Sequence, residues 1–275
     1  MRINNNITAI NSHRQYTINN AGIGKNVEKL SSGFRVNRAG DDAAGLAISE
    51  KMRTQIRGLN MASKNSQDGI SLVQTAEGAM QTAHNIMQRM RELAVQSRNG
   101  TNDGDAVAKS LLGGPGGVDR AALNLEFSQL NLEINQIAET VKFNEMTVFG
   151  ETFTLQTGAN SSDFTTFKIG DLKGPGGDIT TEANAKTAMD SLTVSINLLS
   201  SNRAQLGAIQ NRLEYKIQNL DNTAENLQAA ESRIRDVDMA KMMTEFTKNN
   251  ILFQASTAML AQANAIPQGV LQLLG

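Results

Sequence analysis

Few residues of this chain have the type and spacing for chemistry, and their patterns favour structural roles. Asp41 and Asp42 form an adjacent carboxylate pair beside glycine, an arrangement that could suggest a cation site. Such pairs more often accept hydrogen bonds within a turn or cap the next helix. Residues 22–25 carry two glycines and a lysine but lack the spacing and the preceding strand of a phosphate-binding loop. We therefore expect neither a metal site nor a phosphate site here.

Nucleophilic and redox chemistry find no better support. The chain has no cysteine, which excludes disulfides, thiolate catalysis and cysteine-based metal sites. Its two histidines, His13 and His84, lie outside any H-E-x-x-H zinc-protease motif. The net charge of −1, with lysine and arginine scattered along the chain, predicts no nucleic-acid surface. The sequence thus indicates a protein that is not an enzyme and that needs no cofactor.

The two ends of the chain are depleted in charge. Residues 249–275 contain no acidic or basic side chain, and their apolar residues point around all sides of a predicted helix. A helix that is apolar all round must be buried all round, and the interspersed polar residues argue against a membrane span. Residues 3–12 are also uncharged and place isoleucines at helical spacing. We predict a polymerisation interface formed by Ile3, Ile7, Ile10, Ile251, Phe253, Met259, Leu260, Ile266, Val270 and Leu273.

The C-terminal tail is predicted to need other protein around it. Ordering its backbone costs conformational entropy, and an isolated helix cannot bury the apolar side chains that would offset this cost. An isolated tail should therefore be close to disordered.

Heptad spacing is the strongest pattern in the middle of the chain. Apolar residues recur in alternating steps of three and four over 73–94, 123–141 and 192–234, with polar interruptions at Arg203, Gln210 and Glu231 in the last run. Such seams predict long helices packed along their length. The low aromatic content, 4%, favours a thin core of aliphatic seams. The predicted fold is mainly α: a long antiparallel helical bundle or coiled-coil rod, with the N- and C-terminal helices paired.

The pattern changes between residues 148 and 181. Segments 152–156 and 164–169 are rich in threonine and phenylalanine, and 158–163 reads as a turn, so we expect a β-hairpin capping the rod. We assign residues 1–44 and 236–275 to a terminal coiled-coil domain. Residues 45–235, with the hairpin around 148–181, form a helical rod domain.

Four separated blocks of this sequence resemble the bacterial flagellin family. They are residues 26–49 (NVEKLSSGFRVNRAGDDAAGLAIS), 90–97 (MRELAVQS), 231–240 (ESRIRDVDMA) and 260–268 (LAQANAIPQ). The resemblance extends over about residues 1–100 and 121–275. It implies a structural subunit that polymerises into the flagellar filament for swimming, with the terminal domain lining the inner tube and no large outer variable domains. A hook–filament junction adaptor is the alternative within the wider superfamily.

The resemblance also implies partners and a location. Copies of the same chain, a flagellar export chaperone, the filament cap and hook-junction proteins are the expected partners. Flagellins leave the cell unfolded through the flagellar type III system, and residues 1–6 lack the apolar core of a cleaved signal peptide. We expect an extracellular location without a membrane span.

Two further sets of residues follow from the resemblance. Arg89, Leu93 and Glu126 match the positions through which many flagellins contact the vertebrate Toll-like receptor for flagellin. Flagellins often carry O-linked sugar on the outer face, which makes the hairpin hydroxyls of Thr157, Ser161, Ser162, Thr165 and Thr166 candidate acceptors. The segment 103–120 departs from the family because it inserts extra residues and a glycine-proline loop. We expect this insert on the surface of the rod.

Overall fold

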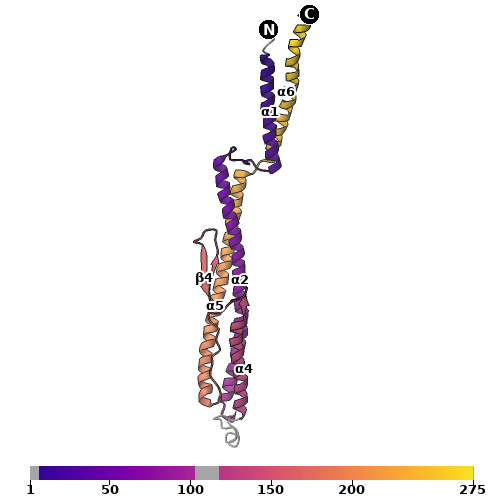
Figure 1. The fold of residues 1–275 in the computed structure, drawn as a ribbon. Coiled ribbons are helices and arrows are strands. Elements are labelled where there is room, and N and C mark those ends of the chain that lie inside the picture. Colours follow the sequence, from indigo (N-terminus) through magenta and orange to yellow (C-terminus); the bar gives the residue numbers. More distant parts are fainter. Residues whose placement is uncertain (1–5, 103–117, 275) are drawn as a thin grey trace. The chain divides into compact units, whose positions relative to one another are not determined.

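The computed structural model describes residues 6–102 and 118–274, and the side chains of the last helix as far as residue 265 (Figure 1). Residues 103–117 of the 103–120 insert, whose role the sequence left open, lie outside the described residues, and residues 118–120 begin a helix. The helices are α1 (Ile7–Ser32), α2 (Ala43–Arg98), the short 3-10 helix η1 (Gly100–Asn102), α4 (Val118–Thr140), α5 (Glu182–Arg235) and α6 (Met239–Leu274). The strands are β1 (Lys142–Phe143), β2 (Met146–Thr147), β3 (Thr152–Gln156) and β4 (Phe164–Lys168). The predicted fold class, mainly α with a small antiparallel hairpin, is confirmed.

The chain divides into two compact units. The first, which we call the terminal unit, combines Met1–Ile56 with Glu225–Gly275. The second, the central unit, is Arg57–Ala224. Each unit is described separately below.

The core of the central unit is built from the predicted seams. Every position of the 73–94 seam is buried, including Met80, Met87 and Met90. Phe127 and Ile134 of α4 and Leu192, Leu199 and Leu206 of α5 join them in one hydrophobic cluster. The heptad spacing thus predicted the packed faces correctly, because a 3.5-residue repeat keeps one stripe of a helix against its neighbour.

Two polar interruptions of the α5 seam, Arg203 and Gln210, make polar contacts of different kinds. The third, Glu231, has a buried Oε1 atom without a hydrogen-bond partner among the described residues. Arg203 lies 3.5 Å from Glu77 of α2, which gives an interhelical ion pair. Gln210 instead donates to Glu214 on its own helix, at 2.9 Å. Of these two seam positions, Arg203 is the one with a polar contact across the helices.

Both hairpins are antiparallel two-stranded ribbons. The predicted hairpin is confirmed as β3 and β4, in which Phe153 pairs with Phe167. The preceding hairpin of β1 and β2 was not predicted; its turn uses Asn144 and Glu145 at positive φ. Asparagine is a usual residue at such a φ, but glutamate is uncommon there, so the turn carried a weak sequence signal.

The β3–β4 hairpin lies alongside α2 and α5 and does not cap a helix end, which corrects that part of the prediction (Figure 1). A Cβ built on Gly69 of α2 would clash with Leu155 and come within 3.4 Å of Leu213 of α5. Near the hairpin turn, a Cβ on Gly58 would lie 2.9 Å from the Ala159 Cβ and 3.2 Å from its Cα. Glycine at these positions lets the hairpin dock flat against the helices.

The terminal unit contains α1 and α6 side by side, running in opposite directions (Figure 1). At one end, Asn6 donates from Nδ2 to the Ala263 carbonyl at 2.8 Å. Further along, Asn19 donates to the Ser256 hydroxyl at 2.9 Å. The predicted pairing of the N- and C-terminal helices is therefore confirmed.

A short clasp joins the two segments that enter this helix pair. Phe34 and Asp236 form an isolated antiparallel bridge, and the Arg35 N–H donates to the Arg235 carbonyl at 2.6 Å. The Arg235 guanidinium lies 4.8 Å from the centroid of the Phe34 ring and donates to Glu50 at 2.6 Å. The cation–π contact and the ion pair together hold these two chain segments against each other.

Asp41 and Asp42 make the turn and cap contacts that were predicted. Asp41 accepts from the N–H groups of Arg38 and Asn37, each at 3.2 Å. These donors, Arg38 first, hold the pKa of the Asp41 carboxyl below its ordinary value. Asp42 accepts from the Gly45 N–H at 2.8 Å and so caps the start of α2.

We predict that hairpin docking depends on the absence of a side chain at residue 58. Alanine in a helix is about 1 kcal/mol more favourable than glycine, whereas overpacking costs about 1–3 kcal/mol. Gly58→Ala should therefore lower the free energy of unfolding by about 1 kcal/mol. The measurement is urea unfolding followed by circular dichroism.

Gly78→Ala is the matched control, because the Gly78 site in the same helix has open space around it. It should raise the free energy of unfolding by about 0.5–1 kcal/mol. Equal stabilisation by both substitutions would contradict the tight contact at residue 58.

Candidate assembly interface

The outward faces of α1 and α6 expose large apolar side chains in the single chain. Ile7 is 59% exposed and Ile10 is 62% exposed on α1, and Ile251 and Met259 are each 61% exposed on α6. A soluble monomer rarely leaves such a contiguous apolar set in water. This surface is the principal candidate for a functional site.

Contacts between α1 and α6 cover only part of their apolar surface. Phe253 is half-buried, with its ring 5.0 Å from the Tyr16 ring. Leu260 is also half-buried. In the described part of α6, Met242 and Ala263 are the fully buried apolar residues. Pairing within one chain therefore leaves most of the helix surface uncovered.

The side chains of the remaining predicted interface residues lie outside the described part of the structure. Ile3 lies outside the described residues. Ile266, Val270 and Leu273 lie in the last turns of α6, where the backbone is helical and the side chains are not described. Their part in an interface stays a prediction.

The sequence interpretation missed two members of this apolar surface. Ile18 of α1 is 57% exposed and Leu252 of α6 is 41% exposed. Ile18 follows Ile7 by eleven residues, about three helical turns, so both share a face. Ile18 lies beyond the charged Arg14, outside the uncharged N-terminal segment on which the prediction was based.

Arg89 and Glu126, two of the three receptor candidates, meet on the surface of the central unit. The Arg89 Nε donates to Glu126 at 2.9 Å, and Nη1 donates to Glu92 at 3.1 Å. The hydrogen bond that Arg89 donates to Glu126, and secondarily the one that it donates to Glu92, raises the pKa of the Arg89 guanidinium. Leu93, the third candidate, is buried in the core. The exposed part of this set is therefore an ion-paired polar surface.

The candidate glycosylation hydroxyls differ in their accessibility. Thr157 and Thr165 are buried, and their hydroxyls hydrogen-bond each other at 3.0 Å. They are thus closed to a glycosyl donor in this fold. Ser161, Ser162 and Thr166 are exposed and stay candidate acceptors.

The described residues offer neither a metal site nor a membrane-spanning helix. No cluster of three or more histidine or acidic side chains suited to a metal ion occurs among them. Within the same part of the chain, no helix combines the length and the apolar character that a membrane crossing requires.

Comparison with known proteins agrees with this arrangement. Residues 3–154 match the bacterial flagellin N-terminal helical region, and residues 189–274 match the bacterial flagellin C-terminal helical region. The chain is 56% identical to a flagellin of Halalkalibacterium halodurans and 48% identical to a flagellin of Bacillus subtilis, with all of both chains covered in each comparison. It is 45% identical, over the full length of both chains, to the flagellar filament 33 kDa core protein of Treponema phagedenis. The chain belongs to the bacterial flagellin family.

Proposed function

We propose that this chain is a structural subunit that polymerises with copies of itself into a bacterial flagellar filament. The apolar outer surface of the α1–α6 pair carries the proposal, since neighbouring copies would bury what one chain leaves exposed. Each large apolar side chain buried in this way contributes about 1.5–3 kcal/mol. The role is structural and requires no catalytic residue, cofactor or metal.

Filament subunits account for this chain better than junction adaptors do. The relatives reported above are named as flagellins and as a filament core protein. The adaptor alternative is therefore not favoured.

Within the filament, we assign different roles to the two regions of the chain. Residues 1–44 and 236–275 would line the inner tube, where their apolar faces are surrounded by other copies. Residues 45–235 would form the outer wall, since the central unit has a buried core of its own. No large variable domain is assigned outside it, because residues 169–181 lead directly from β4 to α5.

The exposed apolar surface of α1 and α6 also has consequences for export and for the proteins that would bind the subunit. Terminal segments that fold fully only in contact with other subunits would pass unfolded through the flagellar type III channel. A dedicated export chaperone would cover the apolar residues of α6 before export, and the filament cap and hook-junction proteins would meet the subunit at its destination. We expect the subunit in an extracellular flagellar filament.

We also infer that the released subunit is a ligand of the vertebrate Toll-like receptor for flagellin. Arg89 and Glu126 would provide the polar contact, because both lie at the surface. Leu93 would act by holding the α2 backbone in place, since it is buried.

Polymerisation should depend on the exposed apolar residues of α6. We expect the double substitution Ile251→Ser with Met259→Ser to raise the critical concentration at least tenfold, because a loss of about 1.4 kcal/mol already gives that factor. The measurement is seeded elongation, followed by pelleted mass and negative-stain images. Gln254→Ser with Gln262→Ser is the matched control at exposed polar positions, and it should elongate normally. Normal elongation of the apolar double variant would refute the proposal.

The ends should be ordered by assembly. In the free subunit, limited proteolysis should remove residues near both termini and leave the central unit intact, because the tail alone cannot offset its ordering entropy. In the filament the same sites should be protected. Mass spectrometry of the fragments measures both states. Protease-resistant ends in the free subunit would instead support a monomeric binding protein.

Receptor activation should depend on the surface ion pair. Arg89→Ala should reduce the response of reporter cells that carry the receptor about tenfold, which corresponds to the loss of one charged contact at an interface. Lys64→Ala, at another exposed position of α2, is the control and should leave the response unchanged. Equal responses for both variants would remove Arg89 from the receptor contact.

A further inference from the structure

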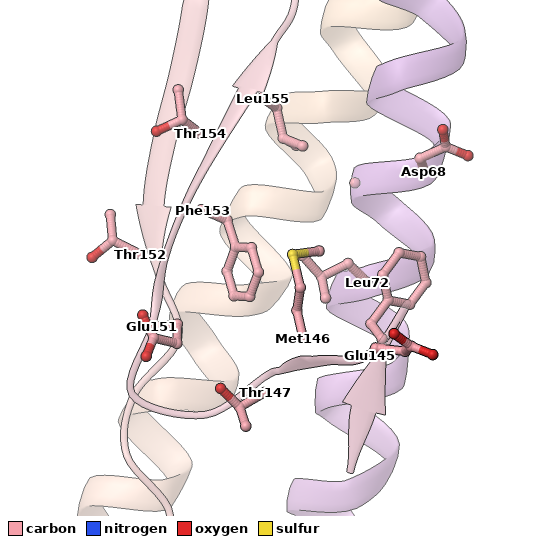
Figure 2. A pocket seen from close by; sticks show the side chains of 12 residues that line it. Asp68, Leu72, Glu145, Met146, Thr147, Glu151, Thr152, Phe153, Thr154 and Leu155 are labelled. Carbon is pink, nitrogen blue, oxygen red and sulfur yellow. The ribbon is translucent and has the colours of Figure 1, made fainter.

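An open groove in the central unit lies between the two hairpins and α2 (Figure 2). Its volume is about 700 Å³. Phe153 of β3 and Met146 of β2 face each other across it. Thr152 and Thr154, the neighbours of Phe153 in β3, point away. Leu72, Phe143 and Leu155 complete the apolar lining. The apolar lining suits an aromatic side chain, and the volume leaves room for the residues that flank such a ring.

The rim of this groove is acidic. Asp68, Glu145 and Glu151 line it, and no lysine or arginine does. All three are exposed, and none forms an ion pair with another described residue. The rim therefore favours a basic partner that brings an apolar group with it.

Tyr215 of α5 has the complementary character. It is 72% exposed, and it lies between the basic residues Arg212 and Lys216. Neither basic residue has an ion pair within the described part of the chain. The neighbouring Glu214 is engaged by Gln210 at 2.9 Å. An exposed tyrosine flanked by free positive charge is typical of the residues that dominate protein interfaces.

The groove and Tyr215 lie on opposite sides of the central unit at the same level. Leu213 faces inward, because it and Leu155 of the groove both approach Gly69 of α2. Tyr215 follows Leu213 by two residues, which turns it by about 200° around the helix. One chain therefore cannot place Tyr215 in its own groove, but a neighbour at the same height can.

We propose that the Tyr215 side chain of one subunit docks into the Phe153–Met146 groove of a second copy beside it. The ring would pack on the apolar lining, the tyrosine hydroxyl would donate to a rim carboxylate, and Arg212 and Lys216 would pair with the acidic rim. Each subunit both donates and accepts one such contact, so the contact is heterologous and can link a series of copies side by side. The proposal rests on the filament function and names a lateral contact within it.

Cross-linking tests the contact directly, because the native chain has no cysteine. A full-length chain that carries both Tyr215→Cys and Met146→Cys, assembled from seeds well above its raised critical concentration, should give a covalent ladder when the filaments are treated with a short bismaleimide. Dilute subunits should give none. The control combines Met146→Cys with Val194→Cys, a position on α5 that is 67% exposed and about 31 Å from Tyr215 along the helix. It should give no ladder in the same filaments.

Two charge variants test the rim. Arg212→Glu and Glu151→Lys should each raise the critical concentration about tenfold through like-charge repulsion, and the two together should restore it to within about threefold. Tyr215→Ala should raise it by at least tenfold. Circular dichroism at low concentration shows whether each variant is folded before assembly.

The outcomes separate this contact from the function on which it rests. Failure of the unmodified chain to form filaments would overturn the filament function. Normal filaments without a Tyr215–Met146 ladder, or with an equal ladder in the Val194 control, would overturn the docking alone. A ladder specific to the Tyr215 pair, together with charge-swap rescue, supports it.

Discussion

The terminal helices carry more apolar surface than a single chain can cover. This constraint follows from a C-terminal segment without any charged residue and from an α1–α6 pair that buries little of its own surface. Apolar area left in water favours association, and the driving force grows with the area that association removes. A surface of this kind is costly in a monomer and stabilising in an assembly. The proposed burial of these ends between copies of the chain follows from this constraint.

The central unit meets the opposite requirement. Its three helical seams bury a continuous core of methionine, leucine, isoleucine and alanine, and interhelical ion pairs join Arg203 to Glu77 and Arg89 to Glu126. Unbranched methionines pack into a narrow seam without the bulk of aromatic rings. This part of the molecule can fold before assembly and present fixed surfaces to its neighbours. The clasp of Phe34, Arg235 and Glu50 then holds together the two segments that enter the α1–α6 pair.

Self-assembly also needs contacts through which one copy can join the next. A site and its complement on opposite sides of one unit provide such a contact, since every added copy exposes a further acceptor. The acidic groove and the basic Tyr215 segment are proposed to form such a pair. Opposite charge at their rims steers the encounter and disfavours the wrong pairing of two grooves or two tyrosine segments.

The sequence by itself determined the elements whose signals are local or periodic. The 73–94 and 192–234 seams, the β3–β4 hairpin and the Asp42 cap were all predicted, because heptad spacing, strand composition and capping chemistry are properties of neighbouring residues. Only the tertiary structure decided which of the candidate site residues are buried and which are exposed. It buried Leu93 beside the exposed Arg89, and it closed the Thr157 and Thr165 hydroxyls against each other. It also assembled the groove from α2 and two hairpins, whose residues are distant in the chain. Burial and complementarity across such distances depend on packing in three dimensions, which no local pattern encodes.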